Sequence, residues 1–197
     1  AFKGTTTRSA VQIAEEVEAV GGQINAYTAR EQTAYYIKVL KENTPLATDI
    51  IGDILTHSTF ETQELERERG VILQEIGQAN DTPDDIIFDH FQEVAYPAQP
   101  LGRPILGSED GIRQMPRATL TAYMQRHYGA GNTVVAAAGN LQHEVIVDLV
   151  GKHFGDLSAA VPPPTEPATY RGGEFRQVRD LDQVHVVLGF PSVGYGH

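Results

Sequence analysis

The stretch that most constrains the fold is Glu61 to Gln78, a run of charged and apolar residues with the sequence ETQELERERGVILQEIGQ. Its apolar residues Leu65, Ile72 and Ile76 recur at helical spacing. An apolar stripe with this period is typical of an amphipathic helix that packs one face on a core. The spacing therefore predicts one long helix over this stretch, with its charged residues on the remaining surface.

Acidic side chains lie beside the apolar stripe, and they are Glu64, Glu68 and Glu75. Glu68 and Glu75 are seven residues apart, which is two helical turns, so their carboxylates point in nearly the same direction. Two aligned carboxylates beside an apolar stripe form either a solvated charged edge or half of a cation site. Charge runs of this kind are most often solvated faces, and the helix alone leaves both interpretations open.

Composition excludes several classes of function. The net charge of −11 argues against a nucleic-acid surface. No apolar stretch approaches the roughly eighteen residues of a membrane-spanning helix. The absence of cysteine excludes a disulfide framework and a thiolate metal site. The chain opens at Ala1 without an initiator Met or a targeting signal and closes at His197 after an apolar run, so we expect a fragment of a longer protein.

Local patterns predict the remaining elements. Before the acidic helix we expect a helix over 10–20 capped by Ser9, a hairpin of strands over 23–29 and 32–40, and a helix over 44–57. After it we expect helices over 82–95, after Ser108, over 116–128 and over 141–154, a Pro/Gly-rich loop over 98–107, and a buried strand over 132–139. This order predicts an α+β fold of two layers, with helices packed on a mostly antiparallel sheet.

The domain organisation follows from a proline-rich segment. Residues 159–168, AAVPPPTEPA, contain four prolines and are typical of a linker. Residues 1–158 are therefore expected to form one α+β domain. Residues 169–197 are expected to open a second domain through strands over 174–180 and 183–190.

No complete catalytic or metal motif is present in the sequence. The seven histidines do not form HExxH, HxxEH or HxH, and His90 comes nearest, but Val94 stands where a second histidine is needed. There is no GxSxG for a serine nucleophile and no GxxxxGK[ST] or GxGxxG for a nucleotide.

Short motifs stand in order along the chain: FKGT at 2–5, EEVEAVGG at 15–22, INAYT at 24–28, Thr59-Phe60, ERERGVILQEI at 66–76 and LGRPILG at 101–107. Single motifs such as FKGT are weak, but their order and spacing over nearly the whole chain are specific. Together they resemble the pitrilysin/insulinase family of inverted-zincin metallopeptidases, most of all its mitochondrial processing peptidase β-subunit branch with the bacterial relatives.

The resemblance implies a zinc endopeptidase. In this family an HxxEH motif precedes the FKGT-like segment; its two histidines bind zinc and its glutamate activates water. Those three residues are expected upstream of Ala1. The family's third zinc ligand falls on Glu75, and a further acid that orients the metal site falls on Glu68.

The resemblance also implies how a peptide binds. The strand that contains Asn25, Ala26 and Tyr27 matches the edge strand to which family members add the substrate as an extra strand. From β-propensity alone this is equally an ordinary strand in which Tyr27 packs or is half exposed.

Two acids of the helix over 82–95 match a pocket for an arginine near the scissile bond. Asp85 and Asp89 are one turn apart, so both can face one cation, and arginine–carboxylate pairing is directional and charge-assisted. The alternative is that Asp84 and Asp85 are acids favoured by the dipole at a helix N-terminus.

The expected function is that of a zinc-dependent metalloendopeptidase acting on extended, basic peptides or presequences, with a second homologous domain or subunit as its partner. The fragment itself is expected to be inactive, because it lacks two zinc ligands and the general base. Two alternatives remain: a non-catalytic partner subunit or core-type structural member of the family, and a general α+β peptide-binding module.

Overall fold

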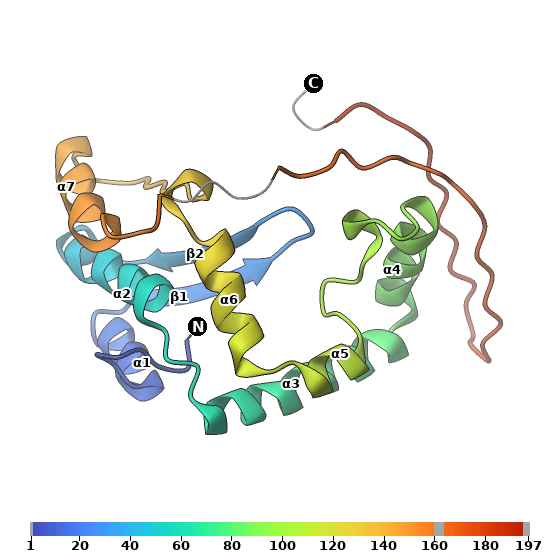
Figure 1. Cartoon of the computed structure of the whole chain (residues 1–197), viewed down its shortest axis with the longest axis horizontal. Coiled ribbons are helices and arrows are strands. Elements are labelled where there is room, and N and C mark those ends of the chain that lie inside the picture. The colour runs from blue at the N-terminus through green and yellow to red at the C-terminus, as the bar shows by residue number, and fades with distance from the viewer. Residues whose placement is uncertain (1, 160–163, 195–197) are drawn as a thin grey trace. The chain divides into compact units, whose positions relative to one another are not determined.

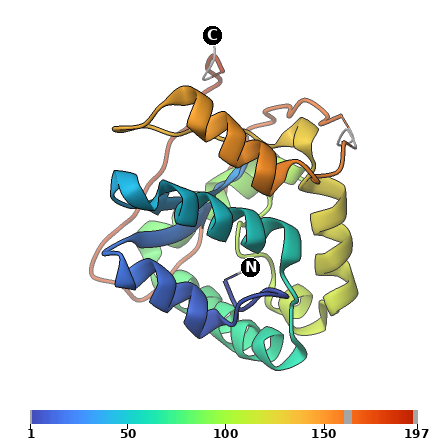
Figure 2. The same cartoon turned by 90° about the vertical axis from the view of Figure 1, so that its left-hand side faces the viewer.

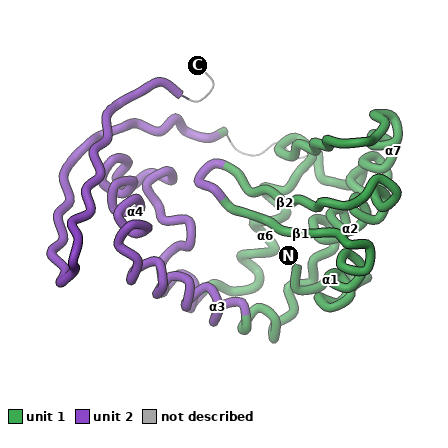
Figure 3. Tube along the Cα trace, turned by 180° about the vertical axis from the view of Figure 1, so that it is seen from behind, with its two compact units in different colours: residues 1–28, 32–67, 115–164 green, residues 29–31, 68–114, 165–197 purple. Residues whose placement is uncertain are grey.

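The computed structural model describes residues 2–159 and 164–194. The chain divides into two compact units, each described here by itself (Figure 3). Unit 1 comprises residues 1–28, 32–67 and 115–164, and unit 2 comprises residues 29–31, 68–114 and 165–197. Residues 160–163 of the expected proline-rich linker lie outside the described residues.

Unit 1 contains the predicted hairpin. Strands β1 (Gln23–Thr28) and β2 (Thr33–Lys38) pair antiparallel, with Gln23 opposite Lys38 and Thr28 opposite Thr33 (Figure 1). Compared with the predicted strands, β1 starts as expected and ends one residue earlier, whereas β2 starts one residue later and ends two residues earlier. In the described part of the chain this is the complete sheet, so β1 keeps one edge without a partner strand.

The core of unit 1 lies between the hairpin and two helices. Helix α1 (Ala10–Ala19) contributes Ile13 and Val17, and α2 (Thr44–His57) contributes Ile50 and Ile54, all four at most 2% exposed. Ser9 caps α1 through the predicted capping box with Gln12. The apolar spacing of both helices therefore produces the buried face that the sequence predicted.

Further helices complete unit 1. Helix α7 (His143–Phe154) packs on α2, so that Figure 2 shows α1, α2 and α7 in successive layers. Gly52 makes that contact possible, because a Cβ there would lie 3.0 Å from the carbonyl oxygen of His153. The other elements are η1 (Lys41–Asn43), the start of α3 (Thr62–Asp81), α6 (Arg117–His127) and η3 (Ala130–Asn132).

Unit 2 consists of short helices and extended chain. The second part of α3 is followed by α4 (Pro83–Ala95), η2 (Pro100–Gly102) and α5 (Glu109–Gln114). The turn residues 29–31 of the hairpin and the chain after residue 164 also belong to this unit. The predicted helices of both units are thus confirmed, with bounds shifted by a few residues.

Three predicted strands are wrong. The structure assigns no strand over 132–139, 174–180 or 183–190, and Val134, predicted to be buried, is 92% exposed. A strand needs a hydrogen-bonding neighbour, and the described residues supply none to these segments. Their β-branched and apolar composition is typical of strands but cannot provide the partner.

The fold is α+β, as predicted, because helices pack on a small antiparallel sheet. Among the described helices, none combines the length and the apolar character needed to cross a bilayer.

Candidate functional site

Helix α3 carries the predicted metal-site acids. Ile76 is 7% exposed and anchors the apolar stripe, whereas Glu75 beside it is exposed. Glu75 makes no side-chain hydrogen bond or ion pair with any described residue. Glu68 is half-buried, and Glu64 is paired with Arg67 at 2.5 Å. Glu75 is therefore an accessible carboxylate that no cation in the described part of the chain neutralises.

A carboxylate oxygen without a competing bond suits a zinc ligand. The part of the chain that the structure describes nevertheless holds no group of three or more histidine, cysteine, aspartate or glutamate side chains that could bind a metal ion. Glu75 therefore fits as one ligand of a site whose other ligands are not among these residues.

The predicted substrate strand, β1, has one edge with which no described strand pairs. Tyr27 is 48% exposed, its hydroxyl accepts a hydrogen bond from Gln32, and its ring lies 6.4 Å from that of Tyr36. The backbone N–H of Ala26 donates to the side-chain oxygen of Asn25 at 2.8 Å. This local bond gives the N–H of Ala26 an acceptor, where an unpaired N–H on an edge strand would otherwise face water.

Helix α4 carries the two predicted arginine-pocket acids, Asp85 and Asp89, which differ in their side-chain partners. Asp85 is exposed and has no side-chain partner among the described residues. Asp89 forms an ion pair with Arg30 at 2.5 Å. Sequence reasoning missed Arg30, since 59 residues separate the two side chains and no periodic pattern connects them.

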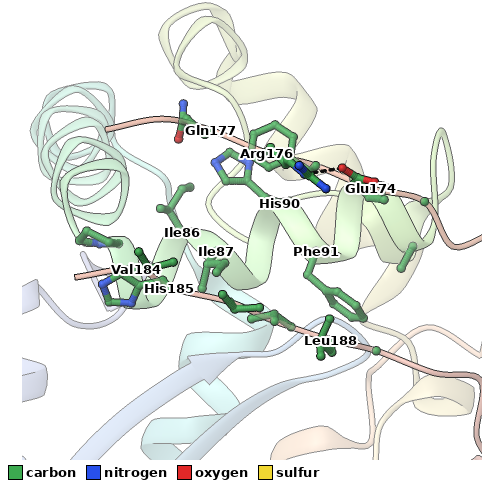
Figure 4. A pocket seen from close by; sticks show the side chains of 18 of the residues that line it. Ile86, Ile87, His90, Phe91, Glu174, Arg176, Gln177, Val184, His185 and Leu188 are labelled. Carbon is green, nitrogen blue, oxygen red and sulfur yellow. Dashed lines mark ion pairs between the residues drawn. The ribbon is translucent and has the colours of Figure 1, made fainter. Parts of the chain in front are cut away.

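A cavity of about 900 Å³ lies beside α4 in unit 2, between this helix and the extended chain over 170–189 (Figure 4). His90 faces it and stacks on Phe175 with ring centroids 4.3 Å apart. The Nε2 atom of His90 is buried without a hydrogen-bond partner. The described residues contain no group of three or more possible metal ligands around His90, and its stacking on Phe175 indicates an aromatic packing role.

The segment at the start of the chain is fixed by an ionic cluster in unit 1. Arg8 contacts Glu16 at 3.1 Å, Asp49 at 2.6 Å and Asp53 at 3.2 Å. Burial lowers the pKa of Arg8, but hydrogen bonds to the three carboxylates outweigh burial and raise its pKa above the ordinary value. Ion pairs with α1 and α2 thus hold the segment that the resemblance places next to HxxEH.

Comparison with known proteins identifies similar chains. Residues 1–109 match the family profile described as Insulinase (Peptidase family M16), and residues 114–197 match the profile described as Peptidase M16 inactive domain.

Three curated relatives are similar along most of this chain. An uncharacterized zinc protease of Rickettsia felis is 42% identical over 99% of this chain and 47% of its own length. A probable mitochondrial-processing peptidase subunit beta of Arabidopsis thaliana is 43% identical over 91% of this chain and 35% of its own length. Subunit 1 of the Bos taurus cytochrome b-c1 complex is 37% identical over 100% of this chain and 42% of its own length. The chain thus spans about half the length of these relatives or less.

A solved structure shows the same fold. The crystal structure of a protease from Helicobacter pylori matches with a TM-score of 0.79 at 23% identity. The match covers 85% of this chain and 42% of that protein.

Proposed function

The chain belongs to the insulinase (M16) peptidase family, and from this premise we propose that it is part of a zinc-dependent metalloendopeptidase that cleaves extended, basic peptides or presequences. The observation that carries the proposal is the exposed carboxylate of Glu75 on α3, which has no side-chain partner among the residues that the structure describes. Glu75 occupies the position that the resemblance gives to the third zinc ligand.

In this proposal Glu75 supplies one oxygen ligand, and Glu68, two turns earlier, orients the metal site. The two histidine ligands and the general base are expected in an HxxEH motif encoded before Ala1. When bound, zinc would polarise the scissile carbonyl and lower the pKa of a bound water. The 197 residues alone should bind zinc weakly, because one carboxylate does not make a tetrahedral site.

One edge of β1 has no partner strand within residues 2–159 and 164–194, and this edge supports peptide binding. An extended peptide added beside Asn25, Ala26 and Tyr27 would be held by backbone hydrogen bonds, which do not depend on its side chains. The N–H of Ala26 would then exchange its bond with Asn25 for one with the peptide. The preference for basic peptides would come from Asp85 and Asp89 on α4.

A second homologous domain or subunit is proposed as the partner. The Arabidopsis relative is named as a subunit, and all three relatives are about twice as long as this chain or longer. A peptide held by one edge strand needs further surfaces to exclude water from the scissile bond.

The proposal is tested on the full-length protein. The residues encoded before Ala1 should contain HxxEH, and the protein should cleave arginine-containing peptides in a reaction that a zinc chelator stops. Cleavage that is unaffected by the chelator would exclude the zinc mechanism.

The second candidate is a non-catalytic member of the family, a partner subunit or a structural core protein. It is favoured by the match of residues 114–197 to the inactive-domain profile and by the relative in the cytochrome b-c1 complex. Replacement of a histidine or the glutamate of HxxEH, together with absence of cleavage, would establish this candidate.

A further inference from the structure

Arg30, in the turn between β1 and β2, places its guanidinium in a site made by other parts of unit 2. One terminal nitrogen donates to Asp89 Oδ1 at 2.5 Å. The other donates to the carbonyl oxygen of Arg103 at 2.5 Å and lies 3.4 Å from that of Leu101. The side chain is 18% exposed. One carboxylate and two carbonyls complement the charge and the donors of a guanidinium, and we call these three groups the cradle.

The carbonyls of the cradle are held by backbone structure rather than by Arg30. They flank Gly102, which is buried and whose missing Cβ would overlap the carbonyl oxygen of Tyr96 at the end of α4. The turn is fixed by the N–H of Gly102 donating to Gln99 and that of Arg103 donating to Pro100. The cradle is therefore formed by the fold and should persist when its occupant leaves.

Arg30 pairs with only one of the two acidic residues on α4. Asp85 and Asp89 lie one turn apart on one face of the helix, but Arg30 neutralises Asp89 alone. Asp85 stays exposed with no side-chain partner in the described chain. A basic side chain that approaches this face meets one free carboxylate and one that is already paired.

We infer that the cradle is a guanidinium-binding site which Arg30 occupies in the absence of substrate, so that Arg30 competes with a substrate arginine and thereby sets the strength of arginine selection. This inference rests on the proposed function for the identity of the competitor. The exchange replaces one guanidinium by another, which conserves the charge and the hydrogen bonds of the cradle. Arg30 is in this sense a specificity-determining residue.

The cradle is tested first without any peptide, in the full-length protein, with ethylguanidinium as the probe. Ethylguanidinium should change the unfolding temperature of Arg30→Ala in the stabilising direction relative to its effect on the wild type. Ethylammonium at equal ionic strength should shift the unfolding temperatures of both proteins equally. The double variant Arg30→Ala/Asp89→Asn should lose the response. Arg113→Ala, which removes an arginine from an exposed pair with Glu109, is the matched control and should behave like the wild type.

Equal responses of Arg30→Ala and the wild type, or an undiminished response of the double variant, would overturn the inference. Arg30→Gln, which keeps more of the side-chain volume, serves for the same comparison if Arg30→Ala does not fold.

Competition is tested with two peptides that differ by arginine or citrulline at one position. Loss of Arg30 should lower KM for the arginine peptide by about tenfold relative to the citrulline peptide, the value of a charge-assisted hydrogen bond. An unchanged ratio in a protein that cleaves both peptides would contradict the competition. Absence of cleavage of either peptide would contradict the proposed function instead, and the ethylguanidinium result would stand independently.

Discussion

Asp53 on α2 is a buried carboxylate on which the start of the chain depends. It is 7% exposed and accepts hydrogen bonds from the hydroxyls of Thr5 at 2.6 Å and Thr7 at 2.7 Å, besides its ion pair with Arg8. Burial raises its pKa, but the two hydroxyls and Arg8 together lower it below its ordinary value. The charged form of Asp53 is thus the form that the folded state favours.

This lowered pKa predicts a pH dependence of stability. The stabilisation is complete above the unfolded-state pKa of about 4 and is lost as the pH falls through the lower folded-state pKa. Urea unfolding between pH 6 and pH 3 should show the free energy of unfolding falling toward acid. Asp53→Asn should reduce the slope, whereas Asp84→Asn, an exposed change, should leave it unaltered. A slope unchanged by Asp53→Asn would exclude this role.

Arg8 is predicted to be required for stability. Arg8→Gln removes the arginine partner of the buried Asp53 and should cost about 3 kcal/mol. Arg67→Gln, which removes a 72% exposed arginine from a surface pair, should change stability by less than about 1 kcal/mol. Equal effects of the two substitutions in denaturant titrations would show that the Arg8 cluster contributes no more than a surface pair.

At the scale of elements, the N-terminus of α1 depends on one side chain. Ser9 accepts a hydrogen bond from the N–H of Gln12, and the side chain of Gln12 accepts one from the N–H of Ser9. Ser9→Ala should destabilise unit 1 by about 1 kcal/mol, because the N–H of Gln12 loses its side-chain acceptor. Ser9→Asp keeps an acceptor and should remain close to the wild type in thermal unfolding. A loss of the same size in both variants would exclude capping as the cause.

Gly102 and Gly70 should respond in opposite ways to substitution by alanine, because only Gly102 lies in close contact with another part of the backbone. Gly102→Ala places a methyl group against the backbone of Tyr96 and should cost about 2 kcal/mol or more, with disruption of the cradle. Gly70→Ala on α3 meets nothing within 4 Å and should stabilise the helix by about 1 kcal/mol. Chemical denaturation measures both changes, and a stabilising Gly102→Ala would refute the proposed packing of η2 on α4.

At the scale of the whole molecule, what the sequence could predict depends on how local each feature is. The helices and the capping box at Ser9 follow from residues a few positions apart, and these predictions are confirmed. The segments over 132–139, 174–180 and 183–190 have strand composition, but strand pairing depends on distant neighbours, so their prediction failed. Composition specifies a preference for extended backbone and not the partner that completes a sheet.

The candidate site shows the same division. Periodicity placed Glu68 and Glu75 on one helix but could not tell a solvated edge from a metal site, and only the resemblance assigned a ligand. The contact of Arg30 with Asp89 joins residues 59 positions apart and had no local signal. The sequence pattern therefore identifies candidate acidic residues, whereas the side chains that pair with them are known only from the three-dimensional structure.

Zinc content of the full-length protein tests the central claim most directly. After removal of loosely bound metal, the wild type and Glu61→Gln, an exposed control, should each retain about one zinc per chain, the content of a single three-ligand catalytic site. Glu75→Gln should lose most of that zinc, because a carboxamide is a poorer ligand than a carboxylate. A Glu75→Gln protein that holds zinc as tightly as the wild type would contradict the assignment of Glu75 as a ligand.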